Sequence, residues 1–166
     1  MFLKFKNMSE FWEENFVDKQ EIWGFEPAKS AELTKNLFIE KSINNILIPG
    51  IGYGRNAQIF KENGINFTGI EISKTAIALA QKHYATNINI FHGSVTEMPF
   101  DNKEYDGIFC YALIHLLNKE ERTKLISDCY YQHITLHFAK SYISRPLQKT
   151  VLSASFFLIS FFSTIQ

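Results

Sequence analysis

Cysteine is scarce in this sequence, and neither sign of charge is in excess. The two cysteines, Cys110 and Cys129, stand far apart without the close spacing of zinc ligands, so neither a disulfide framework nor a zinc site is indicated. Basic and acidic residues both number 17, which gives a formal net charge of zero. Because the chain has neither a basic excess nor a basic cluster, it lacks the charge pattern typical of nucleic-acid binding. No nucleic-acid partner is therefore expected.

Long hydrophobic runs are also missing before the C-terminal part of the chain. The first seven residues, MFLKFKN, are too short and too interrupted by lysine to form the core of a signal peptide. Nothing before the C-terminal end approaches the roughly 20 apolar residues of a membrane span. With 166 residues, 46% of them hydrophobic, the sequence favours one globular domain, and the scarcity of cysteine makes the cytoplasm its expected location.

Glycine and acidic residues disappear toward the end: no glycine follows Gly107, and no acidic residue follows Asp128. The turns of an α/β domain draw heavily on Gly, Asn and Asp, so further strands are not expected here. We therefore divide the chain into a domain over residues 1–130 and an atypical hydrophobic, Ser- and Phe-rich tail over residues 131–166. We hypothesise that the tail is not the native continuation, for instance because of a frameshift. A genuine membrane-associating helix is the competing interpretation.

The most informative stretch is residues 45–56, NILIPGIGYGRN, where an apolar run gives way to three alternating glycines. This pattern predicts a buried strand that turns sharply into a helix. Gly50, Gly52 and Gly54 can adopt positive φ and allow a ligand to approach the backbone, while the following helix presents unpaired N–H groups. The stretch alone indicates a nucleotide-type cleft.

Strand and helix patterns alternate around this stretch. Ser9 is expected to cap a first helix with Trp12 and Phe16 on one face, and Pro27 suits the first turn of the second. The other expected elements are helices over 28–40, 55–62, 74–83 (capped by Ser73) and 118–130 (capped by Asn118 with Glu121), and strands over 43–48, 66–71, 88–91 and 105–110. This order predicts an α/β fold, a Rossmann-like doubly wound, mainly parallel sheet with helices on both faces. An N-terminal helical cover over residues 1–40 precedes it, and the sheet is expected to be incomplete at its C-terminal end.

Ligands of such sheets bind outside the carboxyl ends of the strands, so four strand ends are expected to build the site. They are the glycine loop, Glu71 after the second strand, residues 92–100 after the third and residues 110–115 after the fourth. Glu71 lies about twenty residues beyond the first glycine, where a carboxylate can accept the hydroxyls of a ribose. The site therefore indicates a nucleoside-containing cofactor.

Read together, Gly50-x-Gly52-x-Gly54, Glu71, the Gly93-Ser94 loop and Tyr105-Asp106 resemble a class I S-adenosylmethionine-dependent methyltransferase over roughly residues 11–130. The Pro-Gly entry to the loop and the tryptophan-containing N-terminal segment are most similar to the thiopurine methyltransferase and tellurite-resistance type. The resemblance implies S-adenosyl-L-methionine as the cofactor and methyl transfer to a small molecule.

The resemblance also implies a role for each strand end. The glycine loop would contact the methionine half, Glu71 the ribose, Ser94 and Val95 the adenine, and Tyr111 and Ala112 the surroundings of the sulfonium. The implied cofactor-binding residues are Gly50, Gly52, Gly54, Glu71, Ile72, Ser94, Val95, Tyr111 and Ala112.

Methyl transfer from a sulfonium needs little acid–base machinery, because the leaving group is a neutral thioether. Positioning and water exclusion are expected to supply most of the catalysis, with aromatic walls from residues such as Trp23, Tyr53 or Tyr111. His115 is the candidate for a polar contact or base, and a structural histidine is the alternative. His133 and His137 have ligand-like spacing but no carboxylate or cysteine companions, so no metal is expected.

Two alternatives to a methyltransferase stay open. Gly52-x-Gly54-x-x-Ala57 satisfies the loose dinucleotide fingerprint, so an NAD-dependent oxidoreductase fits the same loop. A truncated, inactive domain that retains the cofactor cleft is the second alternative. The sequence identifies neither the methyl acceptor nor the oligomeric state.

Overall fold

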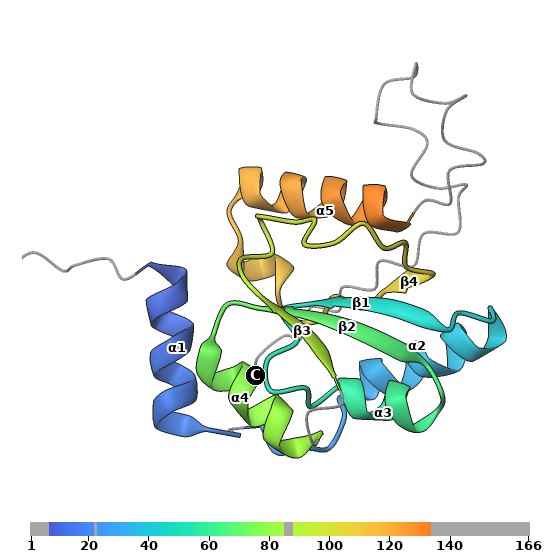
Figure 1. Cartoon of the computed structure of the whole chain (residues 1–166), viewed down its shortest axis with the longest axis horizontal. Coiled ribbons are helices and arrows are strands. Elements are labelled where there is room, and N and C mark those ends of the chain that lie inside the picture. The colour runs from blue at the N-terminus through green and yellow to red at the C-terminus, as the bar shows by residue number, and fades with distance from the viewer. Residues whose placement is uncertain (1–6, 22, 85–87, 134–166) are drawn as a thin grey trace, which may run out of the picture.

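The computed structural model describes residues 7–21, 23–84 and 88–133, and they form one layered α/β arrangement (Figure 1). The elements in chain order are α1 (Met8–Lys19), α2 (Lys29–Glu40), β1 (Asn45–Pro49), α3 (Ala57–Glu62), β2 (Asn66–Glu71), α4 (Lys74–His83), β3 (Asn89–His92), β4 (Gly107–Ile108), the 3₁₀ helix η1 (Ile114–Leu116) and α5 (Lys119–His133).

The described strands form a parallel sheet in the order β3-β2-β1-β4. In the register, Pro49 of β1 stands opposite Ile70 of β2, and Glu71 stands opposite His92 of β3. β1, β2 and β3 therefore end at the same edge of the sheet. β4 is the outer strand of this described sheet and pairs with β1 from Ile46 onward.

Helices cover both faces of the sheet: α5 lies over one face, and α2, α3 and α4 lie over the other (Figure 1). The core under α2 and α3 includes Phe38, Ile46 and Phe60, each with 0% exposure. The core under α5 includes Leu47 and Leu125. Successive residues of β1 thus alternate between two apolar layers, as a strand buried on both faces does. The predicted doubly wound α/β fold is confirmed.

The N-terminal cover has a small core of its own. α1 lies beside α4, near the end of the sheet from which β2 leads into α4 (Figure 1). Phe16 is the buried residue of α1, and it packs with Tyr53 of the glycine loop and Ala76 of α4. Trp12 and Phe25 pack partly buried against this cluster, so the predicted shared face of Trp12 and Phe16 is confirmed.

Several local expectations need correction. Ser9 does not cap α1: Asn7 does, and its Oδ1 accepts a hydrogen bond of 2.8 Å from the Glu10 N–H. Asn has the short polar side chain that suits an N-cap and stands before the first turn. Pro27 lies outside α2, whose N-cap is Ala28.

Two element lengths also differ from expectation. α3 starts at Ala57 instead of residue 55, because the glycine loop continues as turns through Asn56. The strand expected over residues 105–110 is reduced to Gly107–Ile108. It pairs with β1 alone within the described sheet, so only a short ladder forms.

Other boundaries follow the sequence closely. Ser73 caps α4, and its Oγ accepts a hydrogen bond of 3.0 Å from the Ala76 N–H. Asn118 and Glu121 form the predicted reciprocal capping box at the start of α5, with bonds of 2.8 and 2.9 Å. Both caps fix helices that begin near the carboxyl edge of the sheet.

Residues 134–166, which contain nearly all of the tail that the sequence sets apart, lie outside the described residues. The frameshift hypothesis and the competing membrane-helix interpretation both concern this part. Among the helices of the described ranges, none is long and apolar enough to cross a membrane.

Candidate functional site

The carboxyl ends of three strands are tied to one another by backbone hydrogen bonds. Gly50 N–H and Ile51 N–H both donate to the Ile70 carbonyl, at 2.8 and 3.1 Å, and Gly93 N–H donates to the Glu71 carbonyl at 3.0 Å. These bonds continue the ladders past the strand ends. The glycine loop, the exit of β2 and the exit of β3 therefore lie side by side, as the sequence predicts.

The three loop glycines all have positive φ, but they face different surroundings. A Cβ at Gly54 would lie 2.6 Å from Cε2 of Tyr84, so this glycine makes room for a core aromatic ring. A Cβ at Gly50 would lie 3.2 Å from Cδ1 of Leu113. At Gly52 the nearest atom is Cζ of Phe16, at 3.7 Å, and the residue is partly exposed. Gly52 is thus the loop position with the most open side.

Glu71 is the polar centre of this edge, and it is only 6% exposed. Its Oε2 accepts a hydrogen bond of 2.8 Å from the Gly52 N–H, and its Oε1 accepts bonds of 2.9 Å from the N–H groups of Ile72 and Ser73. Burial raises the pKa of the Glu71 carboxyl, while these donors partly oppose the rise. The carboxylate links the glycine loop to the start of α4.

A second carboxylate lies next to this centre, and sequence reasoning missed it. Glu13 of α1 accepts hydrogen bonds from Ser73 Oγ at 2.7 Å and from Thr75 Oγ1 at 2.6 Å, and a longer one of 3.3 Å from the Thr75 N–H. The signal available was its position three residues before Phe16, which places both side chains on one face of the helix. Nothing in the sequence identified its partners.

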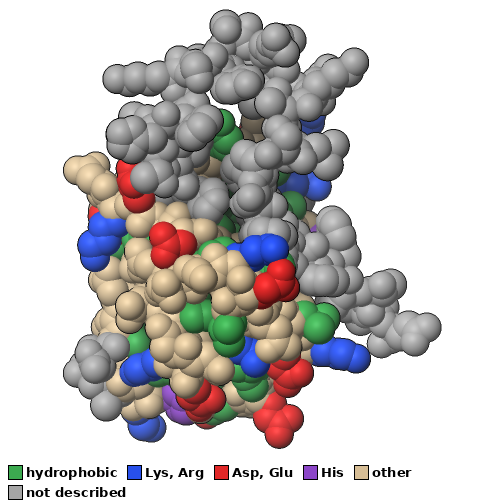
Figure 2. Space-filling model, turned by 90° about the vertical axis from the view of Figure 1, so that its right-hand side faces the viewer, with side chains coloured by type: hydrophobic (Ala, Val, Ile, Leu, Met, Phe, Trp, Pro, Cys, Tyr) green, Lys and Arg blue, Asp and Glu red, His purple; other side chains and the backbone are tan. Residues whose placement is uncertain are grey.

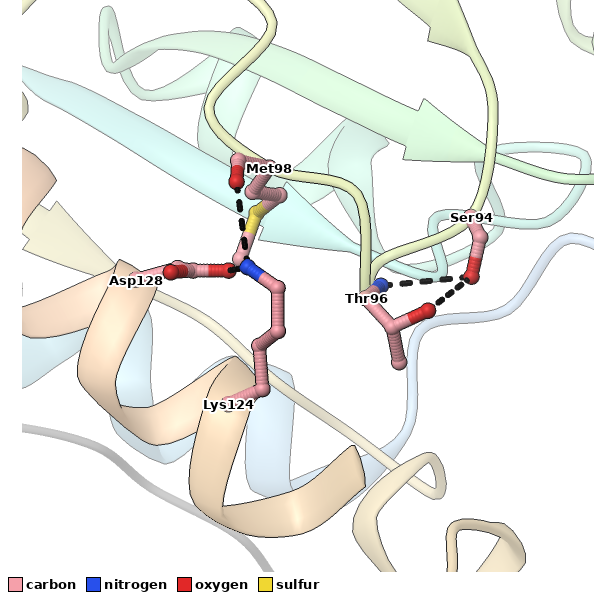
Figure 3. Close-up of polar contacts among 5 residues, drawn as sticks. All are labelled: Ser94, Thr96, Met98, Lys124 and Asp128. Carbon is pink, nitrogen blue, oxygen red and sulfur yellow. Dashed lines mark hydrogen bonds and ion pairs between the residues drawn. The ribbon is translucent and has the colours of Figure 1, made fainter. Parts of the chain in front are cut away.

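Ser94 and Val95, expected to flank an adenine, start the loop after β3. Figure 3 shows the Ser94 hydroxyl directed at Thr96: the two side-chain oxygens are 2.7 Å apart, and the Thr96 N–H donates to Ser94 Oγ at 3.2 Å. Val95 is 7% exposed and packs in the core with Leu47 and Ile70. Contacts from this pair to a ligand would therefore rest mainly on their backbone.

The same loop is held from the other side by α5. Figure 3 shows Lys124 reaching from α5 toward Met98, with its Nζ 3.5 Å from the Met98 carbonyl oxygen. Lys124 also pairs with Asp128 at 2.7 Å, one turn further along the helix. The loop therefore contacts α5 as well as the sheet, and its Met98 side chain is buried.

The exit of β4 completes the edge. Leu113 packs against Gly50, which brings this exit next to the glycine loop. Ala112 has φ of +53°, a conformation that costs energy for a residue with a Cβ and that occurs often at functional sites. Tyr111 is partly buried and stacks on Phe109 with an interplanar angle of 3°. His115, the candidate base, lies on η1 with an exposed side chain.

The aromatic candidates from the N-terminal segment differ in exposure. Trp23 is 49% exposed and stacks on Tyr53 with an interplanar angle of 10°. Tyr53 itself is 1% exposed, and its hydroxyl donates to the Gly24 carbonyl at 2.8 Å while accepting from the Trp23 N–H at 3.1 Å. Tyr53 therefore holds the N-terminal connector against the glycine loop, and Trp23 presents the accessible ring.

The cysteines and histidines form no further centre in the described ranges. Cys110 and Cys129 are both free and fully buried, and burial raises the pKa of the Cys110 thiol to about 12. No group of three or more metal-ligating side chains occurs among residues 7–21, 23–84 and 88–133. The side chains of His133 and His137, the pair with ligand-like spacing, lie outside the described part.

A hollow of about 390 Å³, lined by Lys61, Asn66 and Asn89 among others, lies at the amino ends of β2 and β3, opposite the strand exits. Figure 2 shows acidic and basic side chains interspersed on the described part of the face it presents. The described residues that line the hollow include no carboxylate, whereas Glu71 lies at the strand exits.

The family model described as "Methyltransferase domain" matches residues 46–132, which is more than half of the chain. Among curated proteins, the O-methyltransferase rstn1 of Aspergillus nomiae is 30% identical over 89 residues. That match covers 50% of this chain and 39% of the relative, so the chain spans well under half of the relative's length.

Solved structures share the fold at low sequence identity. Magnesium protoporphyrin IX methyltransferase from Synechocystis PCC 6803 with bound SAM has a TM-score of 0.62 at 13% identity, and the match covers 80% of this chain and 74% of that one. The CcbJ methyltransferase of Streptomyces caelestis also has a TM-score of 0.62, at 17% identity, with 75% and 53% covered.

Proposed function

The chain belongs to the methyltransferase domain family and has the fold of the class I S-adenosylmethionine-dependent enzymes, and from this premise we propose that it binds S-adenosyl-L-methionine and methylates a small molecule. The observation that carries the proposal is the buried Glu71 carboxylate beside the open side of Gly52, where the strand exits meet. Structures of SAM-bound relatives with this fold support the choice of cofactor.

The residues at the strand exits fit this cofactor. Glu71 Oε1 already accepts two backbone N–H groups, but Oε2 accepts only the Gly52 N–H in the described structure. A carboxylate oxygen can accept a second hydrogen bond, so Oε2 can receive a ribose hydroxyl. The open side of Gly52 allows the cofactor to approach the loop backbone.

In the proposed complex, the remaining strand ends position the ligand. The backbone of Ile72, Ser94 and Val95 lines the adenosine side, and Gly50 and Gly54 keep the loop in its turn. Tyr111 and Ala112, at the exit of β4, border the reacting end. When bound, S-adenosylmethionine supplies a methyl group on a sulfonium whose leaving group is a neutral thioether.

Catalysis in this proposal consists mainly of orientation and water exclusion. The accessible ring of Trp23 and the partly buried ring of Tyr111 provide apolar walls for an acceptor. His115, exposed on η1, provides the polar contact or base. No step of this scheme requires a metal.

The methyltransferase subtype, the cellular location, the domain bounds and the class of acceptor are also proposals. The Pro49-Gly50 entry and the tryptophan-bearing N-terminal segment support the thiopurine methyltransferase and tellurite-resistance type. The two free cysteines, Cys110 and Cys129, support the cytoplasm as the location. Residues 1–130 form the proposed methyltransferase domain, and residues 131–166, which contain neither glycine nor an acidic residue, form a separate tail. A structurally similar protein, an amino pentose methyltransferase from Micromonospora echinaspora, supports a small-molecule acceptor.

Isothermal titration with S-adenosylhomocysteine and, separately, with NADH tests the cofactor. We expect saturable binding of S-adenosylhomocysteine and none of NADH; binding of NADH alone would show a dinucleotide site instead. Glu71→Gln should weaken S-adenosylhomocysteine binding about tenfold or more, because it removes a charged acceptor. Glu32→Gln, an exposed site on α2, is the matched control and should leave the affinity unchanged.

Turnover is tested separately with a cofactor carrying a labelled methyl group and a panel of thiol, hydroxyl and amine acceptors. Label in an organic product would establish transfer. Cofactor binding without transfer to any acceptor would instead support the inactive remnant.

A further inference from the structure

We propose that Glu13 is a positioning residue of the cofactor cleft: it fastens α1 to α4 and thereby holds Glu71 and the glycine loop in their binding arrangement. α1 is the first helix of the N-terminal cover, and neither the fold nor the cofactor chemistry by itself requires this carboxylate. The proposal rests on three sets of contacts.

The first is the fastening itself. Both Glu13 oxygens accept short hydrogen bonds from the N-cap and first turn of α4: Oε2 from Ser73 Oγ at 2.7 Å and Oε1 from Thr75 Oγ1 at 2.6 Å. Bonds from hydroxyls to an ionised carboxylate are among the stronger ones in proteins. The bond from Thr75 and the further ones from Ser73 and the backbone lower the pKa of Glu13, although partial burial opposes them. Glu13 is therefore ionised at neutral pH.

The second is the link from Ser73 to Glu71. Ser73 uses its backbone N–H to donate to Glu71 Oε1 and its hydroxyl to donate to Glu13. The same hydroxyl accepts the Ala76 N–H as the cap of α4. Ser73, which is 0% exposed, thus connects the carboxylate of Glu13 on α1 to the carboxylate of Glu71 in the cleft.

The third is the packing of the same face of α1 on the glycine loop. Phe16, one turn after Glu13, is 4% exposed, and its ring edge is the nearest group to the open side of Gly52. Its ring also meets Tyr53 edge-on, with the centroids 6.1 Å apart. α1 therefore touches both sides of the cleft, with Glu13 at α4 and Phe16 at the loop.

Apolar burial alone holds α1 weakly. Phe16 is its one buried side chain, whereas Met8, Phe11 and Val17 are 41–53% exposed. A helix with so little buried apolar surface depends on its polar contacts to stay in place. Removing Glu13 should thus release Phe16 from Gly52 and free Ser73 at the same time.

Hydrogen exchange measured by mass spectrometry on the ligand-free full chain tests the fastening without any assumption about the cofactor. In Glu13→Gln, exchange should rise about fivefold to tenfold in residues 8–19 and also in the glycine loop, residues 49–56. Glu10→Gln, which makes the same change at an exposed position of α1, is the matched control and should exchange like the wild type. Equal exchange in the two variants would overturn the proposal.

Substitutions at Thr75, whose hydroxyl donates to Glu13, give a second test. Thr75→Val removes the hydroxyl and Thr75→Ser keeps it, so only the valine variant should loosen α1. The double variant Glu13→Gln/Thr75→Val should be little worse than either single one, because both changes break the same contact. Additive effects would mean that the two residues act separately, against the proposal.

The effect on the ligand rests on the proposed function. S-adenosylhomocysteine should bind about fivefold to tenfold more weakly to Glu13→Gln than to Glu10→Gln. Unchanged affinity together with a loosened α1 would show a purely structural contact and would overturn the positioning role. Failure of the wild type to bind would count against the cofactor, while exchange in the glycine loop would still decide the role of Glu13.

Discussion

At the scale of single residues, the loop glycines serve different purposes although the sequence presents them as one repeat. Gly52 leaves the backbone accessible beside Glu71, whereas Gly54 leaves room for the ring of Tyr84. Tyr84 also donates a hydrogen bond of 2.7 Å from its hydroxyl to the Gly54 carbonyl. Gly54 is thus needed for packing as much as for the turn.

Gly54→Ala should be markedly destabilising. Its φ of +86° and the 2.6 Å approach to Tyr84 both oppose a Cβ, so we expect a loss of about 2–4 kcal/mol in the free energy of unfolding. Urea unfolding followed by circular dichroism measures this. Gly64→Ala is the matched control, because Gly64 has φ of +75° but nothing within 4 Å of its Cβ position, and it should lose only about 1 kcal/mol. Equal losses of unfolding free energy in the two variants would show that the Tyr84 ring moves aside without destabilising the fold.

At the scale of elements, the attachment of α1 should depend on pH. The pKa of Glu13 is lowered from its ordinary value of 4.5, so Glu13 stabilises the docked helix fully above that value. This stabilisation is lost as the pH falls through the lowered pKa. Glu71, which lies on the other side of Ser73, has a pKa raised by burial and so takes up its proton at a higher pH than Glu13 does.

Trp12 is adjacent to Glu13 and packs near Phe16, which makes its fluorescence a probe of α1 docking. Acrylamide quenching should increase in the wild type as the pH is lowered below about 4.5. In Glu13→Gln, quenching should be high already at neutral pH and should change little in that range. A parallel pH dependence in the two proteins would assign the transition to Glu71 or to another carboxyl group.

Elements with strong local signals were predictable from the sequence. The capping box of Asn118 and Glu121 and the cap at Ser73 are read from short-range chemistry, and the structure has both. β4 was overestimated because strand length depends on pairing partners far away in sequence, and only β1 pairs with it within the described sheet.

The candidate site was predictable only in outline. The alternation of strands and glycines indicates which chain segments meet: Glu71 does contact the glycine loop, and the Gly93-Ser94 turn contacts the backbone of Glu71. The sequence could not indicate that the Ser94 hydroxyl bonds Thr96, or that Glu13 bonds residues 60 and 62 positions away. Such partners depend on how helices pack, which a periodic pattern does not specify.

At the scale of the whole molecule, the domain has cores of unequal size. The two clusters on the faces of the sheet are large, whereas the cluster under the N-terminal cover consists of Phe16, Tyr53 and Ala76 with a few partly buried neighbours. Regions with few buried apolar contacts open at lower free energy than the rest of a protein. α1 and the connector after it should therefore be the least stable part of the described domain, whereas α2 packs in one of the large clusters.

The two tryptophans of the chain, Trp12 and Trp23, both belong to this cover. On heating, tryptophan fluorescence should therefore change several degrees before far-UV circular dichroism, which follows the sheet and its helices. Saturating S-adenosylhomocysteine should bring the two midpoints together. A ligand in the cleft stabilises the state in which α1 is docked on the glycine loop, because it binds only the folded cleft. Coincident midpoints without ligand would show that cover and sheet unfold as one unit.

The register of β4 on β1 also restricts the order in which the sheet can form during synthesis. Asp106, whose carboxylate accepts the Asn45 N–H, lies 61 residues after it, whereas β2 and β3 follow β1 much sooner. A chain leaving the ribosome from its N-terminus can therefore pair β1, β2 and β3 before β4 has emerged. Until then the nascent sheet carries an open edge along the apolar β1, and this is the interval in which a chaperone would have to cover it.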